Sequence, residues 1–93
     1  MKRIKRIHFM GEDWKVTYNP KQVVLLGGEN DDRGVCNIEK KTIYISPKLK
    51  GRELIDTMIH ELLHGYMWWL DEDYVEEISS NIAKILTRMG FSS

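Results

Sequence analysis

One group of residues in the sequence has the types and spacing to do chemistry, His60-Glu61-Leu62-Leu63-His64. Residues four positions apart lie on the same face of an α-helix, so the imidazoles of His60 and His64 can bind one metal ion. Glu61 projects about 100° away from His60, where its carboxylate can take a proton from a metal-bound water. The pattern therefore predicts a metal centre with two histidine ligands and Glu61 as general base.

The alternative interpretation is that two histidines fall on one helix by chance. At about 100° per residue, His60 and His64 lie roughly opposite the apolar stripe of the predicted helix, which argues against a role as core residues. Trp68 shares their side, as expected if this face forms the wall of a cleft. We therefore interpret the motif as a metal site.

Zinc is the ion that this donor set favours. Two imidazoles and a carboxylate form a borderline site for one Zn²⁺ ion, and an open fourth position is typical of catalytic zinc. No third histidine follows the motif, since Leu70 stands six positions after His64 and His8 lies far upstream. We expect the third ligand among the acidic residues that follow: Asp71, Glu72, Asp73, Glu76 and Glu77.

The position of the chain reversal selects among these acids. The motif helix is expected to continue for a little over one turn past His64, so a residue level with His64 should lie about as far into the next helix. This favours Glu76 or Glu77 over Glu72 and Asp73, which stand nearer the reversal.

The helical wheel separates the two favoured acids. Glu76 flanks the core stripe beside Ser79 and Ala83, whose small side chains permit close approach to another element. Glu77 lies on the other flank of the stripe. Both carboxylates remain candidates on geometry alone.

The elements that position these residues divide near residue 50. Residues 3–10 and 14–18 alternate in polarity around a turn signal at residues 11–13, which predicts a β-hairpin. Residues 42–46 have the strongest strand pattern, and residues 35–37 indicate a further short strand. Residues 23–26 form an apolar run of ambiguous type, and a loop is predicted for residues 27–34.

Two helices are predicted for the second half. The first runs from about Gly51 to Trp69, with apolar positions spaced i, i+3, i+4 and i+7. The second begins after Asp71, which can cap it, and ends near Met89, where Gly90 is typical of a left-handed cap. A short break forces the two helices to run back on each other. The predicted core stripe of the second helix consists of Val75, Ile78, Ile82, Ile85, Leu86 and Met89.

Chain length and pattern together predict the fold class. Ninety-three residues suit one domain. We expect residues 1–93 to form an α+β domain, in which a small antiparallel or mixed sheet (1–46) precedes a motif helix (51–69) and a ligand helix (71–89). The single cysteine, Cys36, excludes an internal disulfide and is expected to be a small buried hydrophobic residue.

Charge and hydropathy limit the classes of partner that the protein is expected to bind. The 14 basic and 14 acidic residues sum to zero, which argues against nucleic acid or an anionic membrane as the partner of the whole molecule. No apolar run approaches the ~20 residues of a membrane span, and no signal-peptide pattern is visible. We expect a cytoplasmic protein, in the host cytoplasm if it is virus-encoded. The sequence indicates no oligomeric state.

The arrangement resembles the zincin metallopeptidases, specifically the small glutamate-zincin and SprT-like proteins of phages and prophages. The likeness is most specific over residues 55–64 and continues through residues 70–76 and 88–91. Residues 42–46, followed by residues 49–51, also look like the lead-in to the active-site helix in this family.

The resemblance implies a zinc-dependent peptidase that hydrolyses a peptide or protein substrate. In such proteins the counterparts of His60 and His64 bind zinc, and that of Glu61 is the general base. Glu76, which follows a valine, matches the family's third carboxylate ligand better than Glu77. A zinc-stabilised binding module without catalysis, such as a phage accessory protein that captures a host factor, is the alternative.

The resemblance also implies two further groups of residues that contact the substrate. In zincins, an edge strand before the active-site helix binds the substrate as an added strand, and residues 42–46 occupy that place. A donor that stabilises the oxyanion is also expected, with Tyr44, Tyr66 and Tyr74 as possible residues.

Overall fold

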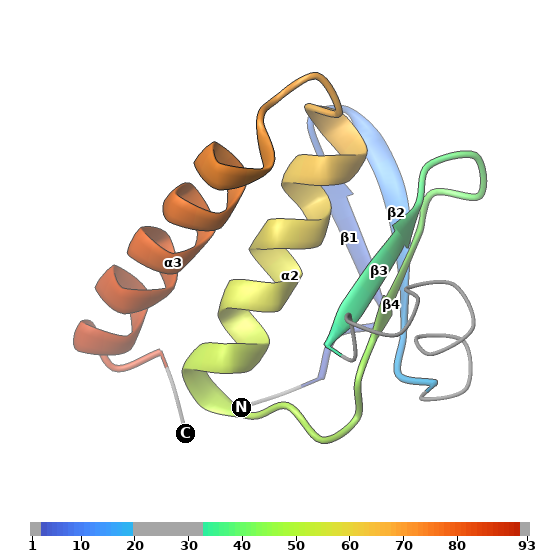
Figure 1. Cartoon of the computed structure of the whole chain (residues 1–93). Coiled ribbons are helices and arrows are strands. Elements are labelled where there is room, and N and C mark those ends of the chain that lie inside the picture. Colours follow the sequence, from blue (N-terminus) through green and yellow to red (C-terminus); the bar gives the residue numbers. More distant parts are fainter. Residues whose placement is uncertain (1–2, 20–32, 92–93) are drawn as a thin grey trace.

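The chain folds into a small mixed sheet followed by two packed helices (Figure 1), which confirms the predicted α+β class. The computed structural model describes residues 3–19 and 33–91. The ambiguous run at residues 23–26 and most of the loop predicted for residues 27–34 lie outside these ranges. Within the described ranges, neither helix is long and apolar enough to cross a membrane.

A β-hairpin opens the described chain. Strands β1 (Arg6–Phe9) and β2 (Glu12–Thr17) pair antiparallel, with Phe9 opposite Glu12. The two residues between them, Met10 and Gly11, have φ angles of 53° and 80°. Two positive φ angles are characteristic of a type I′ turn, whose twist matches that of the flanking strands. The predicted hairpin is confirmed, with its turn one residue earlier than expected.

Strand β4 (Thr42–Ile45) lies inside the sheet. It pairs antiparallel with β3 (Gly34–Asn37) and parallel with β2, which gives the strand order β1-β2-β4-β3. Both short strands confirm the sequence prediction. The expectation that residues 42–46 form a substrate-binding edge strand is wrong, because β4 has a hydrogen-bonded neighbour on each side. The described edge of the sheet next to β4 is β3.

Helix α2 (Gly51–Tyr66) packs on the sheet and forms the core with it. It ends at Tyr66, earlier than the predicted Trp69, and Met67 leaves the helix with φ −111° and ψ 57°. A turn follows, in which the Leu70 N–H donates to the Met67 carbonyl at 2.9 Å, and Trp68 is exposed there. The buried apolar core consists of Trp14, Val16, Ile43, Ile45, Leu49, Leu54 and Leu62.

Helix α3 (Glu72–Arg88) has the two predicted ends. The Asp71 carboxylate caps its start by accepting a hydrogen bond from the Asp73 N–H at 2.8 Å. At its end, Gly90 has a φ of 92°, and the N–H of Phe91 donates to the Leu86 carbonyl at 3.0 Å. This bond is characteristic of a Schellman motif, so the left-handed cap is confirmed.

Helix α3 packs on α2 through a face of small residues. Val75, Ser79 and Ala83 are fully buried, whereas Ile78, Ile82, Ile85 and Met89 are exposed. The predicted close approach at Ser79 and Ala83 is confirmed. The predicted core stripe is right for Val75 and wrong for the four exposed residues, because α3 is rotated to bring its small residues against α2. Figure 1 shows α2 between α3 and the sheet.

The close approach of α2 to the sheet depends on Gly65. A Cβ atom at this position would lie 2.5 Å from Cη2 of Trp14 and 2.9 Å from Sγ of Cys36. Trp14 is itself buried in the core, so its ring has little room to move. A glycine inside a helix usually lowers stability, and here it is required by packing.

We expect Gly65→Ala to lower the free energy of unfolding by about 1–2 kcal/mol. Because the added Cβ would lie 2.5 Å from a buried ring, the overpacking cost should fall in the upper part of the usual range of about 1–3 kcal/mol, and the roughly 0.8–1 kcal/mol that alanine gains in helix propensity is subtracted from it. Urea unfolding followed by circular dichroism measures the change. Arg52→Ala, at an exposed position near the start of α2, is the control and should leave stability nearly unchanged. A Gly65→Ala variant as stable as the native protein would contradict this account of the packing.

Candidate metal centre

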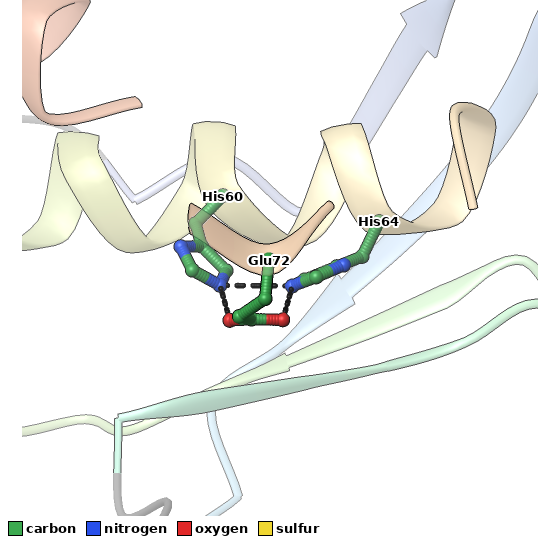
Figure 2. A group of neighbouring side chains, drawn as sticks. All are labelled: His60, His64 and Glu72. Carbon is green, nitrogen blue, oxygen red and sulfur yellow. Dashed lines mark hydrogen bonds and ion pairs between the residues drawn. The ribbon is translucent and has the colours of Figure 1, made fainter. Parts of the chain in front are cut away.

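Three side chains from two helices converge on one point (Figure 2): His60 and His64 of α2 and Glu72 of α3. The two Nε2 atoms of the histidines are 2.9 Å apart. Oε1 of Glu72 is 3.1 Å from Nε2 of His60, and Oε2 is 2.9 Å from Nε2 of His64. Each residue thus offers a donor atom to a single position between them.

The spacing of these atoms is close to what a metal ion requires. Zinc binds imidazole nitrogen and carboxylate oxygen at about 2.0–2.2 Å, so the ligand atoms of a tetrahedral site lie about 3.3 Å apart. The observed separations of 2.9–3.1 Å are slightly shorter and need only a small outward adjustment. Both imidazole rings are mostly buried, with 18% and 28% of the side chain exposed for His60 and His64.

Local structure explains why these three residues meet. The four-residue spacing places His60 and His64 one turn apart on the same face of α2, and their rings meet edge to face with centroids 4.6 Å apart. Asp71 fixes the start of α3, so Glu72 is the first residue of the helix and faces α2. A carboxylate at this position is also favoured by the positive end of the helix dipole.

The carboxylate that the structure brings to the histidines is Glu72, whereas the sequence favoured Glu76. The difference follows from the end of α2. Because α2 ends at Tyr66, it continues only about half a turn past His64, and the chain reverses sooner than expected. A residue level with His64 therefore lies at the very start of α3.

A pocket of about 630 Å³ adjoins this cluster between α2, α3 and the start of β3. It brings His60 and Glu61 of the motif together with both predicted third ligands, Glu76 and Glu77. Trp68, expected on the wall of a cleft, does not line it. The lining residues are Arg33, Gly34, Asp56, Thr57, His60, Glu61, Glu72, Asp73, Glu76, Glu77 and Ser80.

Glu61 is held in the pocket wall with only 5% of its surface exposed. The backbone of Gly34 packs against the same part of α2. A Cβ atom at Gly34 would lie 2.8 Å from Cγ2 of Thr57 and 3.4 Å from Cγ of Glu61. Sequence reasoning missed this role, since Gly34 was assigned to a loop and only the packing of β3 on α2 shows why a side chain is excluded.

The pocket is strongly acidic. Six of its lining residues carry carboxylates, and Arg33 is the one lysine or arginine among them. Arg33 was also missed, because a loop composition does not indicate which element a residue faces. Tyr44, Tyr66 and Tyr74, the donors suggested by the sequence, are absent from the described lining. The pocket is therefore suited to cations and supplies one cationic hydrogen-bond donor, Arg33.

Cys36 is half-buried and lies outside the cluster of His60, His64 and Glu72. Burial raises the pKa of its thiol to about 12, and the nearby charge of Glu61 adds to the increase. The thiol is therefore protonated at neutral pH and is a poor ligand or nucleophile. Cys36 packs against the apolar core as the predicted small hydrophobic residue does, but it is only partly buried.

A scan against family models found no family that matches this chain. Searches among curated proteins and among solved structures found no match either. The function therefore has to be inferred from the chemistry of the site itself.

We expect Asp71→Ala to lower both stability and metal affinity, although Asp71 is not in the cluster. The substitution removes the acceptor of the Asp73 N–H and should cost about 0.5–2 kcal/mol of unfolding free energy. Fraying of the first turn would also release Glu72 from its position. Chemical denaturation and zinc titration measure the two effects, and Asp71→Ser, which keeps a capping oxygen, should restore most of both. Equal values for Asp71→Ala and the native protein would contradict the role of the cap.

Proposed function

We propose that this protein is a zinc-dependent peptidase in which His60, His64 and Glu72 hold one zinc ion and Glu61 is the general base. The observation that carries the proposal is the convergence of donor atoms from two helices. Both imidazole Nε2 atoms and both oxygens of Glu72 lie within 3.1 Å of a partner atom, beside a buried carboxylate in an open pocket.

The donor set fits zinc better than the alternatives. Two imidazoles suit zinc and other late first-row metals, whereas magnesium and calcium prefer oxygen ligands throughout. Three protein ligands leave one position open, as is usual in catalytic zinc sites. Zinc supplies Lewis-acid chemistry, which makes water a nucleophile near neutral pH and polarises a carbonyl group.

Glu61 provides the proton transfer that peptide hydrolysis requires. Its carboxylate oxygen would accept a proton from the attacking water and return it to the amine nitrogen that leaves. The residue follows His60 directly and lies in the pocket wall, so it is beside the ligands without being one of them. A purely structural metal site has no need of a buried carboxylate at this position.

The likeness of residues 55–64 and 70–76 to the small zincin metallopeptidases supports the same proposal. The resemblance points to Glu76 as third ligand, and the geometry points to Glu72. Both residues line one pocket, so their contributions to zinc binding can be compared directly.

Zinc affinity distinguishes the two carboxylates. We expect Glu72→Ala to weaken zinc binding by more than the roughly 10–100-fold that loss of an outer partner costs, because it removes a ligand. Glu76→Ala and Glu77→Ala should weaken it much less, since they remove only nearby charge. Competition with a fluorescent chelator measures the dissociation constants.

Glu39→Ala is the matched control, because Glu39 is an exposed acid in the β3–β4 turn. It should leave zinc affinity unchanged. A larger loss in Glu76→Ala than in Glu72→Ala would instead assign the third ligand to Glu76. Absence of stoichiometric zinc from the native protein would rule out the metal site altogether.

Catalysis needs its own test. We expect Glu61→Gln to retain zinc and fold while peptide hydrolysis falls by about 10²–10⁴-fold, because the amide cannot accept a proton. Cleavage of a peptide library, read by mass spectrometry, measures the activity. If the zinc-loaded native protein cleaves nothing that Glu61→Gln leaves intact, the peptidase proposal fails and a zinc-stabilised binding module becomes the better interpretation.

A further inference from the structure

Helix α3 exposes a row of large apolar side chains, which we call the outer stripe. Its members are between 37% and 66% exposed, although they follow one another along a single helix. Isolated exposed apolar residues are common on protein surfaces, but a continuous row marks an interaction site. The outer stripe consists of Tyr74, Ile78, Ile82, Ile85 and Met89.

The apolar surface of α3 is wider than its contact with α2. At about 100° per residue, the buried residues Val75, Ser79 and Ala83 span roughly 80° of the helix surface. The outer stripe extends the apolar arc by about a further 100° on one side. A surface helix normally has one apolar stripe that faces the core, so the width of this arc indicates a second packing partner.

The spacing of the stripe suits a partner helix. Ile78, Ile82, Ile85 and Met89 are separated by four, three and four residues. This alternation is the pattern by which one helix packs along another in a coiled coil. The outer stripe therefore fits a second helix lying along α3.

Occupation of the outer stripe leaves the pocket open. The residues of α3 that line the pocket continue round the helical wheel from the flank of Ala83; they are Glu72, Asp73, Glu76, Glu77 and Ser80. The outer stripe lies on the opposite flank of the buried face. In Figure 1, the sheet lies on the far side of α2, so it does not cover α3 either.

The charges of α3 indicate which helix fits. On the helical wheel, Glu77 and Arg88 both border the outer stripe on its solvent side, whereas the other charged residues of α3 lie farther from it. An antiparallel copy of the same helix would place Glu77 of each copy opposite Arg88 of the other, and would also oppose the two helix dipoles favourably. A parallel copy would place like charges together.

We infer that this protein forms a twofold-symmetric dimer in which α3 packs antiparallel against α3 of a second copy through the outer stripe. A twofold interface uses the same surface on both subunits, so residue i of one copy contacts residue j of the other and the reverse. With the axis near Ile82, Glu77 of each copy faces Arg88 of the other. Glu77 is the one described pocket-lining residue that this arrangement brings into the interface, so the rest of each pocket stays accessible.

Sedimentation equilibrium tests the dimer. We expect the native protein to have twice its chain mass of 11.0 kDa, with a dissociation that depends on concentration. Ile82→Glu, at the centre of the stripe, should weaken the dimer by at least about 30-fold, as loss of a central interface residue does. Because Ile82 is already 39% exposed, the variant should keep its circular dichroism spectrum and its zinc content.

Ile38→Glu is the matched control, since Ile38 is 48% exposed and lies outside α3. It should leave the dimer intact. A native protein that stays monomeric at about 100 μM, where a dimer with micromolar affinity would be well populated, would overturn the inference. So would a dimer that Ile82→Glu does not weaken, because its interface would then lie elsewhere.

Charge exchange tests the direction of the helices. Arg88→Glu and Glu77→Lys should each weaken the homodimer, because each places like charges opposite one another. A mixture of the two variants should recover dimerisation, since both opposed pairs then regain opposite charges. Failure of the mixture to recover would contradict the antiparallel arrangement.

Discussion

The packing of α3 on α2 is the contact on which the candidate centre depends. Among the described residues, α3 contacts α2 and none of the strands, so this one interface holds Glu72 in place. It is close because the buried residues Ser79 and Ala83 are small. That closeness brings the Glu72 carboxylate to within 3.1 Å of His60, and a wider separation of the helices would divide the donor set.

The acidic residues at the start of α3 stabilise the helix and also set the charge of the pocket. Carboxylates in the first turn are favoured by the positive end of the helix dipole, and Asp71 also closes a hydrogen bond there. The same residues crowd negative charge around the pocket, where Arg33 is the one lysine or arginine of the described lining. Mutual repulsion of these carboxylates opposes folding, and a bound divalent cation would relieve it.

Local signals in the sequence predicted the elements, and tertiary packing decided the rest. The hairpin, the strand at residues 42–46, the Asp71 cap and the Gly90 cap depend on neighbours within a few residues, so they could be read directly. The end of α2 could not be read from local signals. Because α2 ends early, the carboxylate that meets His60 is that of Glu72 and not that of Glu76. The face of α3 that is buried was also undecided, because its arc of apolar residues is too wide to identify one partner.

The contacts of this fold also differ in how far apart their partners lie along the chain, which affects folding. His60, His64 and Glu72 belong to two helices joined by a short turn, so their approach closes only a small loop. The parallel pairing of β2 with β4 joins Lys15 to Thr42 and closes a much longer one. Contacts between distant segments form more slowly than local ones, so we expect the β2–β4 register to be set later in folding than the approach of His60, His64 and Glu72.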